Sequence, residues 1–312
     1  MQGNSYPRNG LGLASTICML VCAVILPILT KSAAASEPID GEINPEGCGR
    51  VEPRRRIAGG TPITKLDAPW IVFVQAIHAQ GTQGSVITCG GSIITRNVVL
   101  TAAHCLQYPD LPIQWVRIFY NTTNGAQGPL FYAESKAVHA SYTSHTGLGY
   151  DIALLKTTEM MPIDRFVRPI CLPTKYIEVG NKKVFAAGYG ATDMTETVKG
   201  ALMYARLNAL RNSDCRYQLA HHPPFGRNTR NTLCTMGYGK DICLGDSGGP
   251  LTLNSRGLAV QVGVASSSYD CSGSEGPSTF VRVSTYASWI QDQLKSPENW
   301  EKLNVVPLHI LK

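Results

Sequence analysis

The chain has 312 residues, of which 44% are hydrophobic and 16% are charged, as expected for a globular protein with a lightly charged surface. Its formal net charge is +6, but apart from Arg54-Arg55-Arg56 the basic residues are scattered along the chain. It contains no basic helix and no basic stripe interleaved with aromatic residues, which are the patterns typical of nucleic-acid binders. We therefore exclude a nucleic-acid-binding function.

The N-terminus has the pattern of a secretory signal. Arg8 is the only charge before the apolar stretch 10–30, which leads into Lys31 and the small residues SAAAS. This pattern predicts a signal peptide over residues 1–35, cleaved after Ala35, and a secreted, extracellular protein with no membrane segment in its mature form. A membrane anchor remains the alternative, because a stretch of this length is nearly enough to span a bilayer. The strong apolar core covers only residues 17–29, which favours the signal peptide.

The cysteine content fits an oxidising compartment. The sequence has 10 cysteines, and Cys18 and Cys22 lie in the apolar leader. An even number remains in an exported chain, which predicts four disulfides whose pairing the spacing leaves open. No CxxC pair occurs, and the only close grouping of cysteine with histidine is His104-Cys105, so we predict no metal site.

The order of predicted elements indicates an all-β protein. Residues 36–56 are polar, contain Pro and Gly, and read as an extended segment. From residue 57 onward, short β-rich runs such as WIVFVQAI and LAVQVGVAS alternate with Gly, Pro, Asn and Ser clusters, the pattern of an antiparallel barrel or sandwich. Helical periodicity is convincing only near residues 284–294, in VSTYASWIQDQLK, and the tail 296–312 is left unassigned.

Three short motifs together carry the chemistry of a nucleophilic serine. Ser247 lies in GDSGGP, where flanking glycines let backbone amides approach a reacting carbonyl closely. Serine is a weak nucleophile at its own pKa and needs an adjacent base, which in turn needs an orienting acid. His104 in LTAAHC and Asp151 in GYDIALLK supply these two groups. Each motif alone is compatible with an ordinary turn or surface residue, but the three together indicate a nucleophilic serine.

These motifs and their order along the chain resemble the trypsin/chymotrypsin family of serine endopeptidases, over residues 57 to about 294. The resemblance implies two packed six-stranded antiparallel β-barrels with a C-terminal α-helix. It also implies that His104 is the general base and acid, that Asp151 holds its tautomer and that Ser247 is the nucleophile. The backbone amides of Gly245 and Ser247 would form the oxyanion hole.

The nucleophile elbow of α/β-hydrolases is a rival interpretation, since GDSGG also satisfies G-x-S-x-G. That fold places its catalytic histidine after the serine and the serine on a strand–turn–helix. After Ser247 the only histidine is His309, in the tail, and the surrounding runs alternate between strands and turns. The elbow interpretation therefore fails.

The resemblance also implies that the protein is made as an inactive precursor. Residues 36–56 would be a propeptide and residues 57–312 the peptidase domain, with cleavage between Arg56 and Ile57 in RRRIAGG. The new ammonium of Ile57 would then pair with the buried carboxylate of Asp246, ordering the oxyanion hole and the substrate pocket. Ala58 stands where family members commonly carry Val.

The same resemblance implies the substrate pocket and the disulfides. Asp241 would lie at the base of the pocket, with Ser266, Ser268 and Ser278 around it, and would select Arg or Lys before the scissile bond. Ser268 and Ser278 replace glycines that trypsins usually have, which leaves an elastase-like preference for small residues open. The implied pairs are Cys89–Cys105, Cys215–Cys234, Cys243–Cys271 and Cys48–Cys171, the last one tethering the propeptide.

Accessory features and partners complete the prediction. Asn121 opens the one N-glycosylation sequon, in a Gly-rich loop. The corresponding loop binds calcium in many relatives, but Glu134 is its only acidic residue here, too few oxygen charges for such a site. We expect no cofactor. Expected partners are protein or peptide substrates, an activating trypsin-like protease and protein inhibitors of proteases. A catalytically silent homologue that binds a partner through the same fold remains the alternative.

Overall fold

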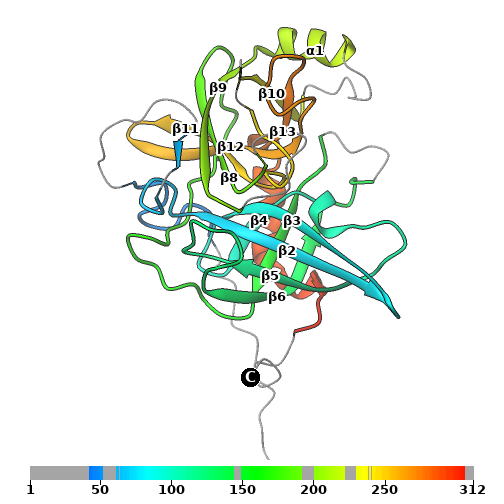
Figure 1. Cartoon of the computed structure of the whole chain (residues 1–312). Helices are drawn as coiled ribbons and strands as arrows, with labels where there is room; N and C mark the ends of the chain where they lie inside the picture. The colour runs from blue at the N-terminus through cyan, green and yellow to red at the C-terminus, as the bar shows by residue number, and fades with distance from the viewer. Residues whose placement is uncertain are drawn as a thin grey trace, which may run out of the picture. The chain divides into compact units, whose positions relative to one another are not determined.

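The structure is a computed structural model, and it describes residues 42–51, 61–62, 64–143, 149–191, 200–221, 230–237, 239 and 241–305 (Figure 1). The predicted signal peptide 1–35, the Arg56–Ile57 cleavage site and residues 306–312 lie outside the described residues. The fold is described for the compact unit that contains the β-rich part of the chain, residues 37–312.

The first half of this unit is a closed antiparallel barrel. Its sheet runs in the order β14-β6-β5-β2-β3-β4-β7, and pairing of β6 with β7 closes six of these strands into a barrel. The six strands are β2 (Ile71–Gln80), β3 (Gln83–Ile93), β4 (Val98–Thr101), β5 (Ile113–Phe119), β6 (Leu130–Val138) and β7 (Ala153–Thr157).

The second half is a barrel of the same kind, which confirms the predicted two-barrel architecture. Its sheet runs in the order β1-β9-β10-β13-β12-β11-β8, and pairing of β8 with β9 closes it, with β1 (Thr61–Pro62) added outside. The six barrel strands are β8 (Lys183–Gly188), β9 (Met203–Ala209), β10 (Thr232–Met236), β11 (Pro250–Ser255), β12 (Leu258–Ser267) and β13 (Ser278–Arg282).

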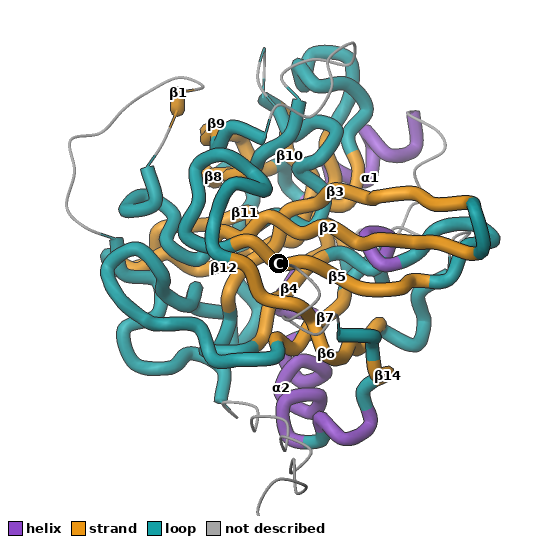
Figure 2. Tube along the Cα trace, turned by 60° about the horizontal axis from the view of Figure 1, so that its bottom comes forward, coloured by secondary structure: helices purple, strands orange, loops and turns teal. Residues whose placement is uncertain are grey.

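The burial pattern of β2 explains its sequence. Residues 71–74 are buried on both faces of the strand, which accounts for the unbroken apolar run IVFV. Beyond Gln75 buried and half-buried residues alternate, because there the hairpin with β3 has one covered face. Figure 2 shows this hairpin projecting past the other strands of the barrel. Gly81, with φ +60°, makes the tight turn at its tip.

The structure contains two α-helices in the described residues, of which one was predicted. The helix expected near 284–294 is α2 (Ala287–Lys295), and a 3₁₀ turn over Val283–Thr285 takes the place of its first residues. The other, α1 (Asn212–His221), has only two buried side chains, Cys215 and Leu219, so it lacks an amphipathic stripe. In the described part of the chain, neither helix has the length and apolar character needed to cross a membrane.

The start of the unassigned tail is an integral part of the first barrel. After a 3₁₀ turn (Pro297–Asn299), the side chain of Trp300 is buried in the apolar core and its indole N–H donates to the Gln293 carbonyl at 3.1 Å. β14 (Glu301–Lys302) then pairs with β6, and Glu301 forms a 3.2 Å ion pair with the buried Lys136.

The described residues contain four disulfides, and they are the pairs that the family resemblance implied. Cys89–Cys105 lies in the first barrel, Cys215–Cys234 joins α1 to β10, and Cys243–Cys271 connects two loops of the second barrel. The fourth, Cys48–Cys171, attaches the segment before residue 57 to the linker between the barrels. This disulfide content is consistent with an extracellular location.

Removing the Trp300 side chain should destabilise the protein strongly, because it leaves a cavity in the core between α2 and the first barrel. We expect Trp300→Ala to lower the free energy of unfolding by about 3–5 kcal/mol. Denaturant unfolding with the disulfides intact measures this. Tyr217→Ala, on the exposed face of α1, is the control and should change stability by less than about 0.5 kcal/mol. An unchanged transition for Trp300→Ala would contradict the packing described here.

Candidate active site

The side chains of His104 and Asp151 meet because their strands are neighbours. β4 and β7 pair antiparallel, so the segment after Thr101 and the segment before Ala153 lie at the same end of the barrel. There Asp151, whose side chain is 3% exposed, accepts two hydrogen bonds from His104. The backbone N–H of His104 donates to Oδ1 at 2.8 Å, and its ring Nδ1 lies 2.7 Å from Oδ2.

The electrostatics of this pair suit a general base. A carboxylate only accepts hydrogen bonds, so Nδ1 carries the proton and Nε2 keeps its lone pair. Burial by itself would lower the pKa of His104, but the charge of Asp151 and its hydrogen bond outweigh burial and raise that pKa. Ser266 donates its hydroxyl to the same Asp151 Oδ2 at 2.6 Å. Because Ser266 lies near the end of β12, the second barrel helps to hold the acid of the first.

The Ser247 loop comes from the second barrel and is bound to the first. The carbonyl of Ser247 accepts the backbone N–H of Gly90, on β3, at 2.7 Å. Cys89, the neighbour of Gly90, is joined to Cys105 beside His104, so the loop is fixed close to the histidine. Within the described residues, the Ser247 hydroxyl and the His104 ring share no direct hydrogen bond. Catalytic hydrogen bonds in unliganded proteins are often long, so this does not argue against the pair.

The backbone around Ser247 leaves two amides free for a reacting oxygen. Gly245 has φ +92° and Gly248 has φ +78°, a left-handed conformation that favours glycine on either side of the serine. Among the hydrogen bonds of the described residues, the amides of Gly245 and Ser247 have no acceptor. The neighbouring amide of Asp246 is already bound, to the Cys243 carbonyl at 3.0 Å.

A cavity of about 240 Å³ opens beside Ser247. On the pocket wall Ser268 accepts the hydroxyl of the buried Ser278 at 2.9 Å and donates to the Asp270 carbonyl at 2.6 Å. Leu244, with 54% of its surface exposed, lines this cavity, and sequence reasoning had singled out neither Leu244 nor Ile242 for it. The lining residues are Ile242, Cys243, Leu244, Gly245, Ser247, Ser266, Ser267, Ser268 and Cys271.

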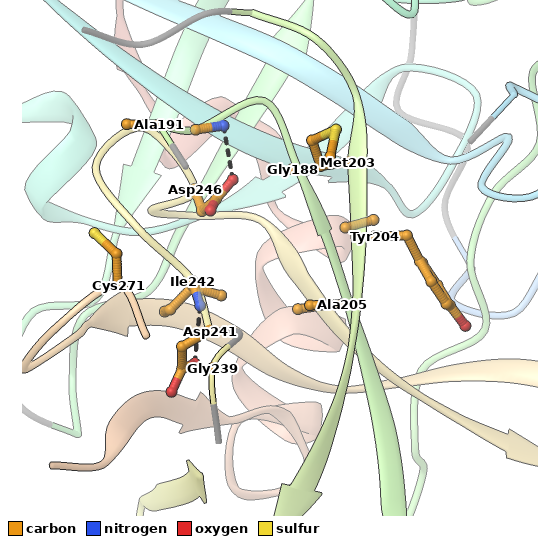
Figure 3. A pocket seen from close by; sticks show the side chains of 13 residues that line it. Gly188, Ala191, Met203, Tyr204, Ala205, Gly239, Asp241, Ile242, Asp246 and Cys271 are labelled. Carbon is orange, nitrogen blue, oxygen red and sulfur yellow. Dashed lines mark hydrogen bonds between the residues drawn. The ribbon is translucent and has the colours of Figure 1, made fainter. Parts of the chain in front are cut away.

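Asp241 lies at a different cavity from Ser247. It lines a larger space of about 440 Å³ that also contains Asp246 (Figure 3). Its Oδ1 accepts the backbone N–H of Ile242 at 2.8 Å, whereas its Oδ2 is buried and has no hydrogen-bond partner among the described residues. Burial raises the pKa of Asp241 to about 7. Ile242 and Cys271 border both cavities, so the two cavities are adjacent, and Asp241 lines only the larger one.

Asp246 is held by two backbone amides at this larger cavity. The N–H of Gly190 donates to its Oδ1 at 2.8 Å, and the N–H of Cys243 donates to its Oδ2 at 2.9 Å. Burial raises the pKa of Asp246 to about 6, against the effect of the two amides. Sequence reasoning did not identify Gly190 or Gly90, since a residue that acts through its backbone amide has no recognisable side chain.

The residues considered for metal binding have other partners. The sulfurs of Cys89 and Cys105, which lie near His104, are bonded to one another and are not thiolate ligands. The carboxylate of Glu134 pairs with the buried ammonium of Lys156, so its charge is already compensated within the described structure.

Comparisons with known proteins agree with this fold. The family model Trypsin matches residues 57–290. The chain is 30% identical to the clotting factor G beta subunit of Tachypleus tridentatus, over 86% of this chain and 89% of that protein. It is 32% identical to the venom serine protease Bi-VSP of Bombus ignitus, over 74% of this chain and 66% of that one.

Two further comparisons extend the picture. Coagulation factor XI of Bos taurus is 30% identical over 78% of this chain, and the match spans 39% of factor XI. The solved structure of HL collagenase superposes with a TM-score of 0.65 at 28% identity, over 77% of this chain and 99% of that one. The fold and these relatives define a serine-type endopeptidase. More narrowly, the chain belongs to the trypsin family.

Replacing Asp151 by asparagine should impair catalysis and shift its pH dependence. The amide removes the negative charge that raises the pKa of His104, so the acid limb of the kcat/KM profile should move to lower pH. We expect kcat to fall about 10⁴-fold, because the favoured tautomer of His104 is lost. Turnover of a peptide anilide across pH 5–9 measures both effects. Asp292→Asn, on the exposed side of α2, should leave the profile unchanged. Wild-type kcat in Asp151→Asn would contradict this assignment.

Proposed function

We propose that this protein is a secreted endopeptidase, made as a zymogen, in which Ser247, His104 and Asp151 form a catalytic triad. The observation that carries the proposal is the buried Asp151 carboxylate bonded to Nδ1 of His104, next to a serine loop with two unbound amides. A secreted enzyme agrees with the four disulfides and with the predicted signal peptide.

The geometry supports the following sequence of steps. Nε2 of His104 takes the hydroxyl proton of Ser247 as its oxygen attacks the scissile carbonyl, and Asp151 stabilises the imidazolium that forms. The amides of Gly245 and Ser247 bind the carbonyl oxygen as it becomes negative, which contributes about 3–4 kcal/mol per donor. His104 then gives its proton to the leaving amine, and water releases the acyl group from Ser247 by the reverse steps.

A catalytically silent homologue remains the second candidate, but the structure offers no observation that favours it. Silent homologues usually lack a member of the triad. Here His104, Asp151 and Ser247 are all retained, and they lie where the two barrels meet. A direct chemical test therefore decides between an enzyme and a binding protein.

The activated protein should be labelled covalently by a serine-directed phosphonate, and Ser247→Ala should not be labelled. We expect the substitution to lower kcat by about a millionfold, since triad members act as a unit. Mass spectrometry of the labelled peptide identifies the modified residue. Ser213→Ala, on the exposed surface of α1, is the matched control and should be labelled like the wild type. Turnover by purified Ser247→Ala at the wild-type rate would refute the triad.

The larger cavity supports activation by cleavage after Arg56. In the single chain Ile57 is bonded to Arg56 and has no free ammonium, while the carboxylate of Asp246 is buried at a cavity of about 440 Å³. This volume is more than ten times the volume of about 30 Å³ that one water molecule takes up in the liquid. The cavity therefore has room for a chain end. Burial raises the pKa of Asp246, and the described residues give its carboxylate no ionic partner, which an entering ammonium would supply.

The uncut chain should be nearly inactive, and the active form should begin with Ile57-Ala58-Gly59-Gly60. We expect Arg56→Gln to resist an activating trypsin-like protease and to remain inactive, because the Asp246 charge stays unpaired. Peptidase assays and N-terminal sequencing before and after treatment measure this. Arg206→Gln, an exposed arginine on β9, should still be cut and activated. Full activity of uncut Arg56→Gln would show that another mechanism operates.

The propeptide should stay attached after this cleavage. Cys48–Cys171 links it covalently. The side chain of Asn44 both donates to the Leu172 carbonyl at 2.9 Å and accepts the N–H of Leu172 at 2.6 Å.

Asn121 is exposed at a turn, as a glycosylation site requires. Proteins are the substrates of trypsin-like enzymes, and other proteases activate them; protein inhibitors are a further proposed partner.

Specificity depends on whether a substrate side chain can reach Asp241. Among the described residues the Asp241 Oδ2 has no hydrogen-bond partner, so it is available to bind the charged group of an arginine or lysine. A buried anion also disfavours apolar side chains. In the single chain Asp241 does not line the pocket at Ser247, and the wall of that pocket carries Ser268, whose hydroxyl is bonded to that of Ser278. Cleavage after Arg or Lys therefore requires these groups to move on activation. A pocket that stays closed would accept small residues.

We expect the activated enzyme to cleave Arg and Lys peptide amides faster than Ala and Phe amides. Asp241→Ser should lower kcat/KM for Arg by about 10- to 100-fold, because a charge-assisted contact is lost. Ser278→Gly, which removes one of the two hydroxyls, should raise it. Parallel kcat/KM measurements on the four amides test this. Faster turnover of Ala than of Arg, or unchanged Arg cleavage in Asp241→Ser, would favour the elastase-like alternative.

A further inference from the structure

A buried polar pair joins the two barrels away from the triad. The hydroxyl of Ser92, on β3, donates to Oε1 of Gln261, on β12, at 2.6 Å, and both residues are 0% exposed. The amide of Gln261 also donates through Nε2 to the Gly263 carbonyl at 3.1 Å. Burial of a glutamine without partners would cost free energy, so these two bonds define the position of its side chain.

Backbone hydrogen bonds converge on the same place. The linker between the barrels binds β3, because the N–H of Ile170 donates to the Ile93 carbonyl at 2.8 Å. One residue further on, the carbonyl of Cys171 accepts the N–H of Gln261 at 2.9 Å. The linker is therefore bonded to β3 through Ile170 and to β12 through Cys171, and the Ser92–Gln261 pair connects the two strands directly. We call this arrangement the barrel junction.

Both strands of the barrel junction continue to the proposed catalytic groups. On β3, Gly90 lies two residues before Ser92, and its N–H donates to the Ser247 carbonyl at 2.7 Å. On β12, Ser266 lies five residues after Gln261 and donates to Asp151 at 2.6 Å. Among the described residues, the first barrel thus donates a hydrogen bond to Ser247 of the second, and the second barrel donates one to Asp151 of the first. A shift of β3 along β12 would therefore change how the serine faces the histidine.

We propose that Gln261 is a positioning residue for peptide hydrolysis: through Ser92 it sets the placement of β3 on β12, and thereby of Ser247 relative to His104. The inference rests on the proposed function, since it assumes that these two residues react together. Gln261 touches neither substrate nor the reacting atoms. Its effect would nevertheless be large, because a misplacement of about 1 Å can cost about 100-fold in rate.

The experiment separates positioning from stability by removing one or both partners. Gln261→Met leaves the Ser92 hydroxyl buried without an acceptor, which should lower Tm by several degrees. The double variant Ser92→Ala/Gln261→Met replaces both partners by apolar groups, and such replacement is often nearly neutral for stability. Thr252→Val is the matched control, because it removes one hydrogen bond, to the Phe185 carbonyl, within the second barrel. Tm, kcat and KM are measured for each activated protein.

We expect kcat to fall at least tenfold in Gln261→Met and in the double variant, with KM within about threefold of wild type, even though the double variant regains most of its Tm. Thr252→Val should lose stability but keep kcat within about twofold. Wild-type kcat in the double variant would overturn the proposal, since packing alone would then hold the strands. Should Gln261→Met fail to fold, Ser92→Ala, which removes a single hydroxyl, answers the same question. An inactive wild type would contradict the proposed function instead.

Discussion

The buried carboxylate of Asp151 is the group around which the proposed site is organised. An ion taken out of water costs several kcal/mol unless donors surround it, and Asp151 has three: the backbone and ring N–H groups of His104 and the hydroxyl of Ser266. Two of these come from the first barrel and one from the second. The carboxylate is therefore satisfied only when the barrels are closed on each other, which couples folding to assembly of the site.

A second constraint arises from the two carboxylates of the larger cavity. Asp246 and Asp241 both have raised pKa values because they are buried, and in the single chain the described residues provide neither with an ionic partner. Close approach of the backbone makes this arrangement possible, since a Cβ on Gly188 or Gly190 would collide with the Asp246 side chain. A cavity with uncompensated negative charge favours the entry of a cation, and in the activation proposed above that cation is the ammonium of Ile57.

The C-terminal segment ties the second barrel to the first. It leaves β13 of the second barrel, and the buried residues of α2 then belong to the same apolar cluster as the first-barrel core. Trp300 extends that cluster, and β14 adds backbone hydrogen bonds to β6. The apolar contacts supply most of the attraction between the halves, whereas the few polar bonds at the barrel junction specify their alignment, because hydrogen bonds are directional and dispersion is not.

The sequence by itself determined what short-range patterns encode: β-rich runs between turn formers, one amphipathic helix, the cysteine content and the three motifs of the proposed triad. The missed elements lack such patterns. α1 buries too few side chains to show periodicity. β14 is two residues long and pairs with Ser135 and Lys136 of β6, beyond the residues that β6 pairs with β5. The tertiary structure alone decided that Asp241 lines a different cavity from Ser247, and that Ser92 meets Gln261, 169 residues away. Contacts between segments so far apart depend on how the barrels pack, and no local feature of either segment records them.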